Sequence, residues 1–179
     1  MSGKYPEQNG LTLPELLISL TVVSTLTVGA GNQLARVIQE SRMVTEVNAF
    51  VTALHLARNE AVKHGVRVVL CPSRNRNHCG NSKDWKSGWI LFQSDDRERD
   101  VGEPLLQTGN PMHAGIAMRS GNHRKRIVYR QDGSSGGSNS SFTFCDSRKL
   151  ARPRVICLSN TGRPRLTKTR CDGKPVDCP

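Results

Sequence analysis

The sequence predicts an α+β protein in which one long N-terminal helix packs on an antiparallel β-sheet. Residues 12–64 carry apolar side chains at helical spacing, first as a continuous apolar run and then as an amphipathic stripe. After Gly65 the spacing of apolar residues changes to two, which is the period of a β-strand. The segments between the expected strands are turn-rich, and none is followed by enough apolar sequence for a second core. We therefore expect one globular domain on the helix.

The apolar run begins directly after Gly10 and contains one carboxylate, Glu15. Residues 11–30 are mostly Leu, Val, Ile, Thr, Ala and Gly, close to the roughly 20 residues that cross a bilayer. A charged side chain inside a spanning helix costs a few kcal/mol, so it usually marks a function. Pro14 suits the first turn of a helix, where its missing N–H has no partner to lose.

The stretch from Gly10 to Leu17 resembles the class III signal of type IV prepilins. That resemblance implies cleavage after Gly10 by a prepilin peptidase, a mature chain that begins at Leu11, and pairing of Glu15 with the amino terminus of a neighbouring subunit. Two alternatives stay open. A secretory signal peptide would be cut near residues 28–30, although its basic n-region is weak. A plain membrane anchor leaves Glu15 without a role.

The second half of the helix is amphipathic and ends at Gly65, after Lys63 and His64 in the last turn. Its apolar stripe, expected to face the sheet, consists of Met43, Val47, Phe50, Leu54, Ala57 and Ala61. Trp85 and Trp89 are expected to fill the core, with base stacking as the alternative use. The expected strands are residues 66–71, 88–93, 115–119, 126–130, 141–145, 155–159 and 165–167.

Six cysteines in an exported chain favour disulfides, and six allow 15 complete pairings. Proximity in sequence suggests the pairs Cys71–Cys79, Cys145–Cys157 and Cys171–Cys178. A zinc site that uses cysteine and histidine ligands is the alternative. The cysteine spacings are irregular and no CxxC pair occurs, which argues against zinc.

Positive charge is concentrated in the last third of the chain. The net charge is +11, and residues 121–179 hold 13 Lys and Arg against 4 Asp and Glu. A basic face of this kind favours a polyanionic partner, because neutralising phosphates releases counterions. The alternative is a solvated surface that keeps the protein soluble.

The predicted globular domain, called the head below, carries further motifs. Cys71-Pro72-Ser73, Cys79, the segment from Trp85 to Phe92 and Asp95-Asp96 resemble the GspH/FimT family of minor pilins and pseudopilins. The resemblance covers essentially the whole chain and implies a type IV pilin-like fold. It divides the chain into a leader (residues 1–10), a transmembrane or pilus-core half-helix (11–35) and a head (36–179). It also implies other pilins as partners, an inner-membrane location with the head in the periplasm before assembly, and an extracellular pilus afterwards.

The segment from Thr161 to Leu166 resembles the G-R-x-R motif of FimT members of that family, which are implicated in DNA uptake during natural transformation. This implies sequence-independent binding of double-stranded DNA through Arg163 and Arg165. The two arginines alternate, so an extended strand would place them on one side, where their guanidinium groups suit phosphate oxygens. The alternative is a structural role in a turn or a pairing with a neighbouring pilin. The flanking basic residues expected to take part are Arg148, Lys149, Arg152, Arg154, Lys168 and Arg170.

No catalytic motif, metal site or cofactor is predicted, because the five histidines are scattered and no serine lies in a nucleophile motif. Three hypotheses follow. The chain is a DNA-binding minor pilin, a purely structural minor pilin or type II secretion pseudopilin, or an exported periplasmic binding protein that loses its first 30 residues.

Overall fold

A computed structural model describes residue 10 and residues 12–82, 84–94, 104–121 and 124–178. The chain separates into two compact units, Met1–Ile38 and Gln39–Pro179. Helix α1, Leu13–His64, contributes residues to both units. The predicted helix over residues 12–64 is therefore confirmed.

In the N-terminal unit, α1 presents large apolar side chains to its surroundings. Leu13 is 76% exposed, Ile18 64% and Leu20 58%. The hydroxyl of Thr21 donates to the carbonyl oxygen of Ile18 at 2.8 Å, a bond that satisfies this hydroxyl within the helix itself. No helix in the described part of the chain has both the length and the mean hydropathy of a membrane span. The membrane-spanning role of residues 11–35 therefore stays a prediction.

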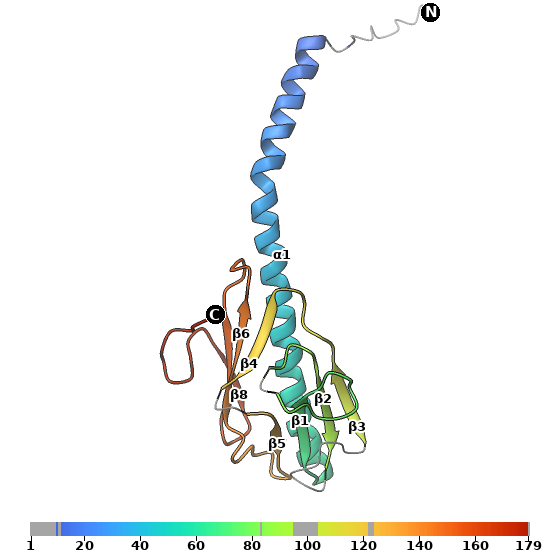
Figure 1. Ribbon diagram of the computed structural model, residues 1–179, viewed down its shortest axis with the longest axis vertical. Coiled ribbons are helices and arrows are strands. Elements are labelled where there is room, and N and C mark those ends of the chain that lie inside the picture. Colours follow the sequence, from blue (N-terminus) through green and yellow to red (C-terminus); the bar gives the residue numbers. More distant parts are fainter. Residues whose placement is uncertain (1–9, 11, 83, 95–103, 122–123, 179) are drawn as a thin grey trace, which may run out of the picture. The chain divides into compact units, whose positions relative to one another are not determined.

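The described residues of the second unit form eight antiparallel strands in two sheets (Figure 1). Sheet 1 has the order β3-β2-β1-β5, and sheet 2 has the order β4-β6-β7-β8. The strands of sheet 1 are β1 Val68–Pro72, β2 Trp89–Gln93, β3 Leu105–Gly109 and β5 Ile127–Tyr129. The strands of sheet 2 are β4 Ile116–Ser120, β6 Ser140–Asp146, β7 Arg154–Leu158 and β8 Pro164–Thr167.

The seven strands expected from the sequence are all present, with ends that shift by one or two residues. Strand β3 was missed. It is an edge strand of sheet 1, and among its residues only Gly109 is buried, so the apolar alternation that marks a strand is absent. The predicted fold class, a long helix with an antiparallel β-sheet head, is confirmed, but the described strands form two sheets and not one. A period of two shows which residues face a core, but it does not show which strands are neighbours.

The core of this unit forms around the helical stripe. Every residue of the predicted stripe, from Met43 to Ala61, is at most 2% exposed. The ring of Phe50 lies 6.4 Å from that of Trp89 in sheet 1 and 5.0 Å from that of Phe142 in sheet 2, measured between centroids. One aromatic side chain therefore contacts both sheets.

The two tryptophans belong to this core. Trp85 is fully buried and Trp89 is 5% exposed. The Trp85 ring packs edge-on against Phe50 at 5.6 Å and against Phe142 at 5.5 Å. Its backbone N–H donates to the carbonyl oxygen of Met118 in β4 at 3.1 Å. The core-filling role is confirmed, and burial leaves no ring face for a stacked base.

Helix α1 ends as the sequence predicts. Gly65 has a φ of 63°, a left-handed conformation that glycine adopts without steric cost. The N–H of Val66 donates to the carbonyl oxygen of Ala61 at 3.2 Å, which is the long bond of a Schellman cap. This cap turns the chain directly into β1.

Gly109 provides a test of the packing between β2 and β3. A Cβ atom at this position would overlap the indole ring of Trp89. We expect Gly109→Ala to lower the free energy of unfolding by about 1–3 kcal/mol, the usual cost of overpacking a core. Urea unfolding followed by tryptophan fluorescence measures this change. Gly136→Ala is the control, because its added methyl meets only the flexible end of Arg130. Equal stability of the two variants would contradict this account.

Candidate nucleic-acid interface

The turn between β7 and β8 presents the predicted arginines. The N–H of Gly162 donates to the carbonyl oxygen of Ser159 at 3.0 Å, which closes the turn. Gly162 has a φ of 77°, and a Cβ atom there would overlap the carbonyl oxygen of Gly133. Pro164 opens the edge strand β8, where a missing N–H is tolerated. The glycine and proline of the motif therefore shape the turn, and Arg163 and Arg165 are left exposed.

Arg165 lies on the outer face of sheet 2. It pairs with Cys157 of β7, which in turn pairs with Ser141 of β6, so the three residues form one row across the sheet. Residues of the neighbouring row, such as Phe142 and Ile156, enter the core. The alternation of side chains along each strand therefore turns Arg165 away from the core.

Three arginines meet at one hollow on this face. The hollow has a volume of about 540 Å³, and Arg163, Arg165 and Arg170 all line it. The first two have no side-chain ion pair or hydrogen bond within the part of the chain that the structure describes, whereas Arg170 lies 3.4 Å from the carboxylate of Asp172. Both members of that pair are exposed, so the pair contributes little to stability. Asp172 also lines the hollow, together with Cys157, Leu158, Pro164 and Cys171 and with the hydroxyl- and amide-bearing residues Asn139, Ser140, Ser141, Ser159 and Thr161.

Two disulfides attach the C-terminal tail, residues 168–178, to sheet 2. Cys157 of β7 bonds Cys171, and Cys145 of β6 bonds Cys178. The predicted pairs Cys145–Cys157 and Cys171–Cys178 were wrong. Cys145 and Cys157 lie on adjacent strands but are not register partners, since Cys157 faces Ser141. Proximity in sequence failed because the tail folds back over the sheet.

The third predicted disulfide, Cys71–Cys79, is confirmed. It closes the loop after β1, and it uses the two cysteines that a zinc site would have needed. The side chain of His78 contacts the amide of Asn75 at 3.0 Å. Among the described residues, no group of three candidate ligands is placed to hold a metal ion.

A second hollow lies under the tail, with a volume of about 320 Å³. Arg170 lines this hollow too, together with Arg119 of β4 and with Val176 and Asp177 of the tail. Arg119 was not among the predicted basic residues. Its place in an alternating strand, between the buried Met118 and Ser120, is the signal that would have identified it as outward-facing.

The other predicted basic residues lie around the hairpin loop between β6 and β7, at the opposite end of β7 from the turn. The guanidinium of Arg148 donates to Gln39 at 2.7 Å and to the carbonyl oxygen of Ala114 at 2.8 Å. Arg154 forms an ion pair with Glu40 at 2.5 Å. Both side chains therefore hold the loop and have less freedom to bind a ligand. Lys149 and Arg152 are exposed beside them, and Lys168 is exposed directly after β8.

Two carboxylates anchor this loop. Burial alone would raise the pKa of Asp146, but N–H donors from Ala151, Arg148 and Leu150 and the amide of Gln39 outweigh burial and hold the pKa below its usual value. Burial opposes ionisation of Glu40 as well. The Arg152 N–H and the Arg154 guanidinium prevail there and lower the pKa of Glu40. Both groups are therefore ionised at neutral pH, and part of the basic charge of the loop is neutralised.

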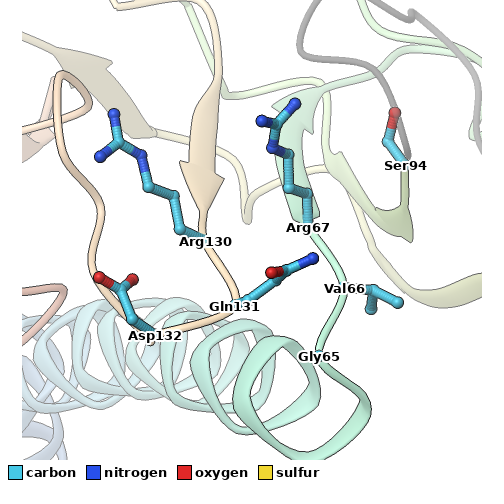
Figure 2. A pocket seen from close by; sticks show the side chains of 7 residues that line it. All are labelled: Gly65, Val66, Arg67, Ser94, Arg130, Gln131 and Asp132. Carbon is cyan, nitrogen blue, oxygen red and sulfur yellow. The ribbon is translucent and has the colours of Figure 1, made fainter.

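A third hollow, of about 620 Å³, lies near the end of α1 (Figure 2). Arg67 precedes β1 and Arg130 follows β5, and the antiparallel pairing of these strands brings the two side chains to the same opening. Asp132 lies beside them, and hydrogen bonds from the side chain and backbone of Ser134 lower its pKa. Like the hollow of Arg163, Arg165 and Arg170, which Asp172 lines, this third hollow contains a carboxylate beside its arginines.

Of the predicted processing residues, Gly10 is exposed and Leu11 lies outside the described residues. Glu15 lies in the first turn of α1. Its carboxylate accepts a long bond, 3.5 Å, from the N–H of Thr12. The described residues thus place this carboxylate at the helix start, where a negative charge is favourable.

Comparison with known proteins agrees with this architecture. Residues 46–162 match the family described as type II transport protein GspH. The structure is similar to the Pseudomonas aeruginosa (strain PAO1) type IV minor pilin FimU in two crystal forms, each 19% identical to this chain. One covers 72% of this chain and 88% of its own length with a TM-score of 0.56, and the other covers 72% and 91% with a TM-score of 0.54. No curated protein sequence matches the chain significantly.

The long N-terminal helix and the antiparallel head are the fold of a type IV pilin. The chain belongs to the GspH family, because the family match covers more than half of its length. The resemblance to GspH/FimT minor pilins is thereby confirmed. This is a family of structural pilins and not a class of enzymes, and membership implies association with other pilins. The match ends at Gly162, directly before Arg163.

The anchored loop gives a pH-dependent prediction. The folded-state pKa of Asp146 is depressed, so its ionised form stabilises the fold above the ordinary Asp pKa of about 3.9. That stabilisation is lost as the pH falls through the folded-state pKa. We expect Asp146→Asn to cost about 1–3 kcal/mol at pH 7, because an amide cannot accept all of these donors.

Urea unfolding between pH 7 and pH 2.5 measures this effect. The difference between wild type and Asp146→Asn should shrink as the pH falls. Asp177→Asn, which changes an exposed carboxylate, should leave the urea midpoint at pH 7 unchanged. A constant difference at every pH would show that the carboxylate charge does not stabilise the loop.

Proposed function

We propose that this minor pilin binds double-stranded DNA, independently of sequence, through the hollow lined by Arg163, Arg165 and Arg170. The convergence of these three guanidinium groups on one exposed, hydroxyl-lined hollow carries the proposal. Each guanidinium can donate two parallel hydrogen bonds to a phosphate, and serine and threonine hydroxyls can add further donors. The described residues present no helix that could enter a major groove beside the hollow, so contacts to the phosphate backbone are expected to dominate.

The other predicted basic residues are expected to contribute unequally to DNA binding. Lys168 directly follows the edge strand β8 and adds an exposed positive charge beside the hollow. Lys149 and Arg152 are exposed at the far end of β7 and can add weaker, long-range attraction. Arg148 and Arg154 are engaged with Gln39 and Glu40, so their role in binding is expected to be small.

The pathway to the pilus is part of the same proposal. A prepilin peptidase cuts after Gly10, and the chain is held in the inner membrane by residues 11–35 with its head in the periplasm. Glu15 then pairs with the new amino terminus of a neighbouring pilin during assembly into an extracellular type IV pilus, where the basic hollow captures DNA for natural transformation. The exposed apolar side chains of α1 support a membrane or pilus-core position for this half of the helix, and the exposed carboxylate of Glu15 near its start is accessible to a neighbouring subunit.

The second candidate function is purely structural. The family description, a type II transport protein, favours a pseudopilin of a secretion system. The likeness to the type IV minor pilin FimU favours a minor pilin, for which we propose a place in the pilus tip or priming complex. In either case the arginines would meet an acidic partner subunit. Deletion of the gene would then abolish secretion or piliation, whereas loss of a DNA receptor would impair uptake alone.

The DNA site is tested by fluorescence polarisation with a labelled duplex and the full chain in non-ionic detergent. We expect Arg163→Ala/Arg165→Ala to weaken binding about 100-fold, about tenfold for each charge-assisted hydrogen-bonded pair. The slope of log K against log salt should fall in magnitude by about 0.9 for each phosphate that the variant no longer neutralises.

The matched control is Arg67→Ala/Arg130→Ala, which removes the same charge from the hollow in Figure 2. This control should retain most of the affinity. An equal loss in both variants would show that binding follows net charge, and no loss in the first would remove the site. Thermal unfolding of each variant verifies that the fold is intact.

The processing step has its own test. Mass spectrometry of the protein recovered from its native host should show a mature amino terminus at Leu11, and Gly10→Val should leave the leader attached. A mature terminus at Gly31 would instead favour the exported binding protein. That cleavage would fall inside helix α1.

A further inference from the structure

The tail residue Arg170 reaches the arginine hollow from a separate segment of the chain. Strand β8 ends at Thr167, and Lys168, Thr169 and Arg170 follow it with no strand to fix them. A basic residue at this position of an unpaired tail would ordinarily sample many positions. Arg170 nevertheless lines the same hollow as Arg163 and Arg165, and it lines the hollow under the tail as well.

The bond between Cys157 and Cys171 accounts for this placement. Cys157 is the register partner of Arg165, and the Cα atoms of Cys157 and Cys171 are 5.8 Å apart. Cys171 is therefore bonded to the residue beside Arg165 in the sheet. Because Arg170 directly precedes Cys171, the disulfide fixes the backbone of Arg170 next to the other two arginines.

A tight turn completes the arrangement. The N–H of Arg170 donates to the carbonyl oxygen of Lys174, and the N–H of Gly173 donates to the carbonyl oxygen of Arg170, both at 2.9 Å. Gly173 has a φ of 81°, which a side chain would disfavour. The backbone of Arg170 is thus held on both sides, by β8 and by the closed turn.

The second tail disulfide does not provide this constraint. Cys145–Cys178 ties only the end of the tail, with a sequence separation of 33. If it were the only bond, the whole segment from Lys168 to Asp177 would be a loop fixed at its two ends. Ordering Arg170 for each binding event would then cost conformational entropy.

We propose that the Cys157–Cys171 disulfide is a positioning device of the anion site, which holds Arg170 against Arg163 and Arg165 so that one phosphate group meets three guanidinium groups. This inference rests on the proposed function. It assigns to the bond between strand β7 and the tail a role in ligand binding, beyond stabilisation of the fold. A preorganised guanidinium binds more tightly, because the conformational entropy of ordering its segment is lost when the protein folds and not when the ligand binds.

The experiment is a double-mutant cycle between the disulfide and Arg170, on the full chain in non-ionic detergent with the labelled duplex. The single changes are Cys157→Ser/Cys171→Ser and Arg170→Ala, and the third variant combines them. We expect each change alone to weaken binding about tenfold, the usual effect of one charge-assisted hydrogen-bonded pair. The combined variant should bind no more weakly than Cys157→Ser/Cys171→Ser, because the freed arginine no longer contributes.

Two controls separate positioning from general stabilisation. Cys71→Ser/Cys79→Ser removes a disulfide from sheet 1 and should leave DNA affinity unchanged. A chain with two glycines inserted between Arg170 and Cys171 keeps all three disulfides and should lose affinity as Arg170→Ala does. This insertion also serves if the cysteine variant fails to fold.

The outcomes are distinct. If Arg170→Ala weakens binding equally with and without the disulfide, or if the disulfide variant and the insertion both bind as wild type does, the positioning role is overturned. Either result leaves the proposed function standing, provided that Arg163→Ala/Arg165→Ala still weakens binding about 100-fold. Unchanged affinity in that arginine variant would instead overturn the proposed function.

Discussion

The contact of Phe50 with aromatic side chains from both sheets is the interaction on which the head depends. The two sheets share no strand among the described residues, and both pack on the buried face of α1. Phe50 packs on Trp89 from one sheet and on Phe142 and Phe144 from the other. Aromatic pairs of this geometry contribute about 0.5–1.5 kcal/mol each beyond their buried area. A single helical position therefore joins three elements that are distant in sequence.

This core determines where binding chemistry can lie. Because the inner face of sheet 2 is occupied by the core, every second residue of β6, β7 and β8 faces outward. Arg165 is one of these residues, and Cys157 and Cys145 are outward positions at which the tail is attached. The same alternation thus places Arg165 where a ligand can reach it. It also places the two cysteines that attach the tail, and the tail carries Arg170.

The basic residues divide into two groups by their partners. Those at the β6–β7 loop face carboxylates: Glu40 binds Arg154 directly and accepts the N–H of Arg152, while Asp146 accepts three N–H donors from the loop. Arg163 and Arg165 lack such partners among the described residues, so a ligand phosphate need not displace an internal carboxylate from them. Both groups consist of positively charged residues, so the sequence does not distinguish them. They differ in the carboxylates that the folded chain places beside them.

The sequence by itself determined the features that depend on near neighbours along the chain. These are the helix with its stripe, its end at Gly65, seven of the eight described strands, and the alternation that places Arg163 and Arg165 on one side of a strand. The tertiary structure decided the division into two sheets, the edge strand β3, and the pairing of Cys145 with Cys178 and Cys157 with Cys171. It also decided the partners of Arg148 and Arg154 and the place of Arg170. The physical reason is the sequence separation over which each interaction acts. Periodicity and turn chemistry depend on residues a few positions apart. The neighbours of a strand, a cysteine or a charge are brought together only when the whole core closes around α1.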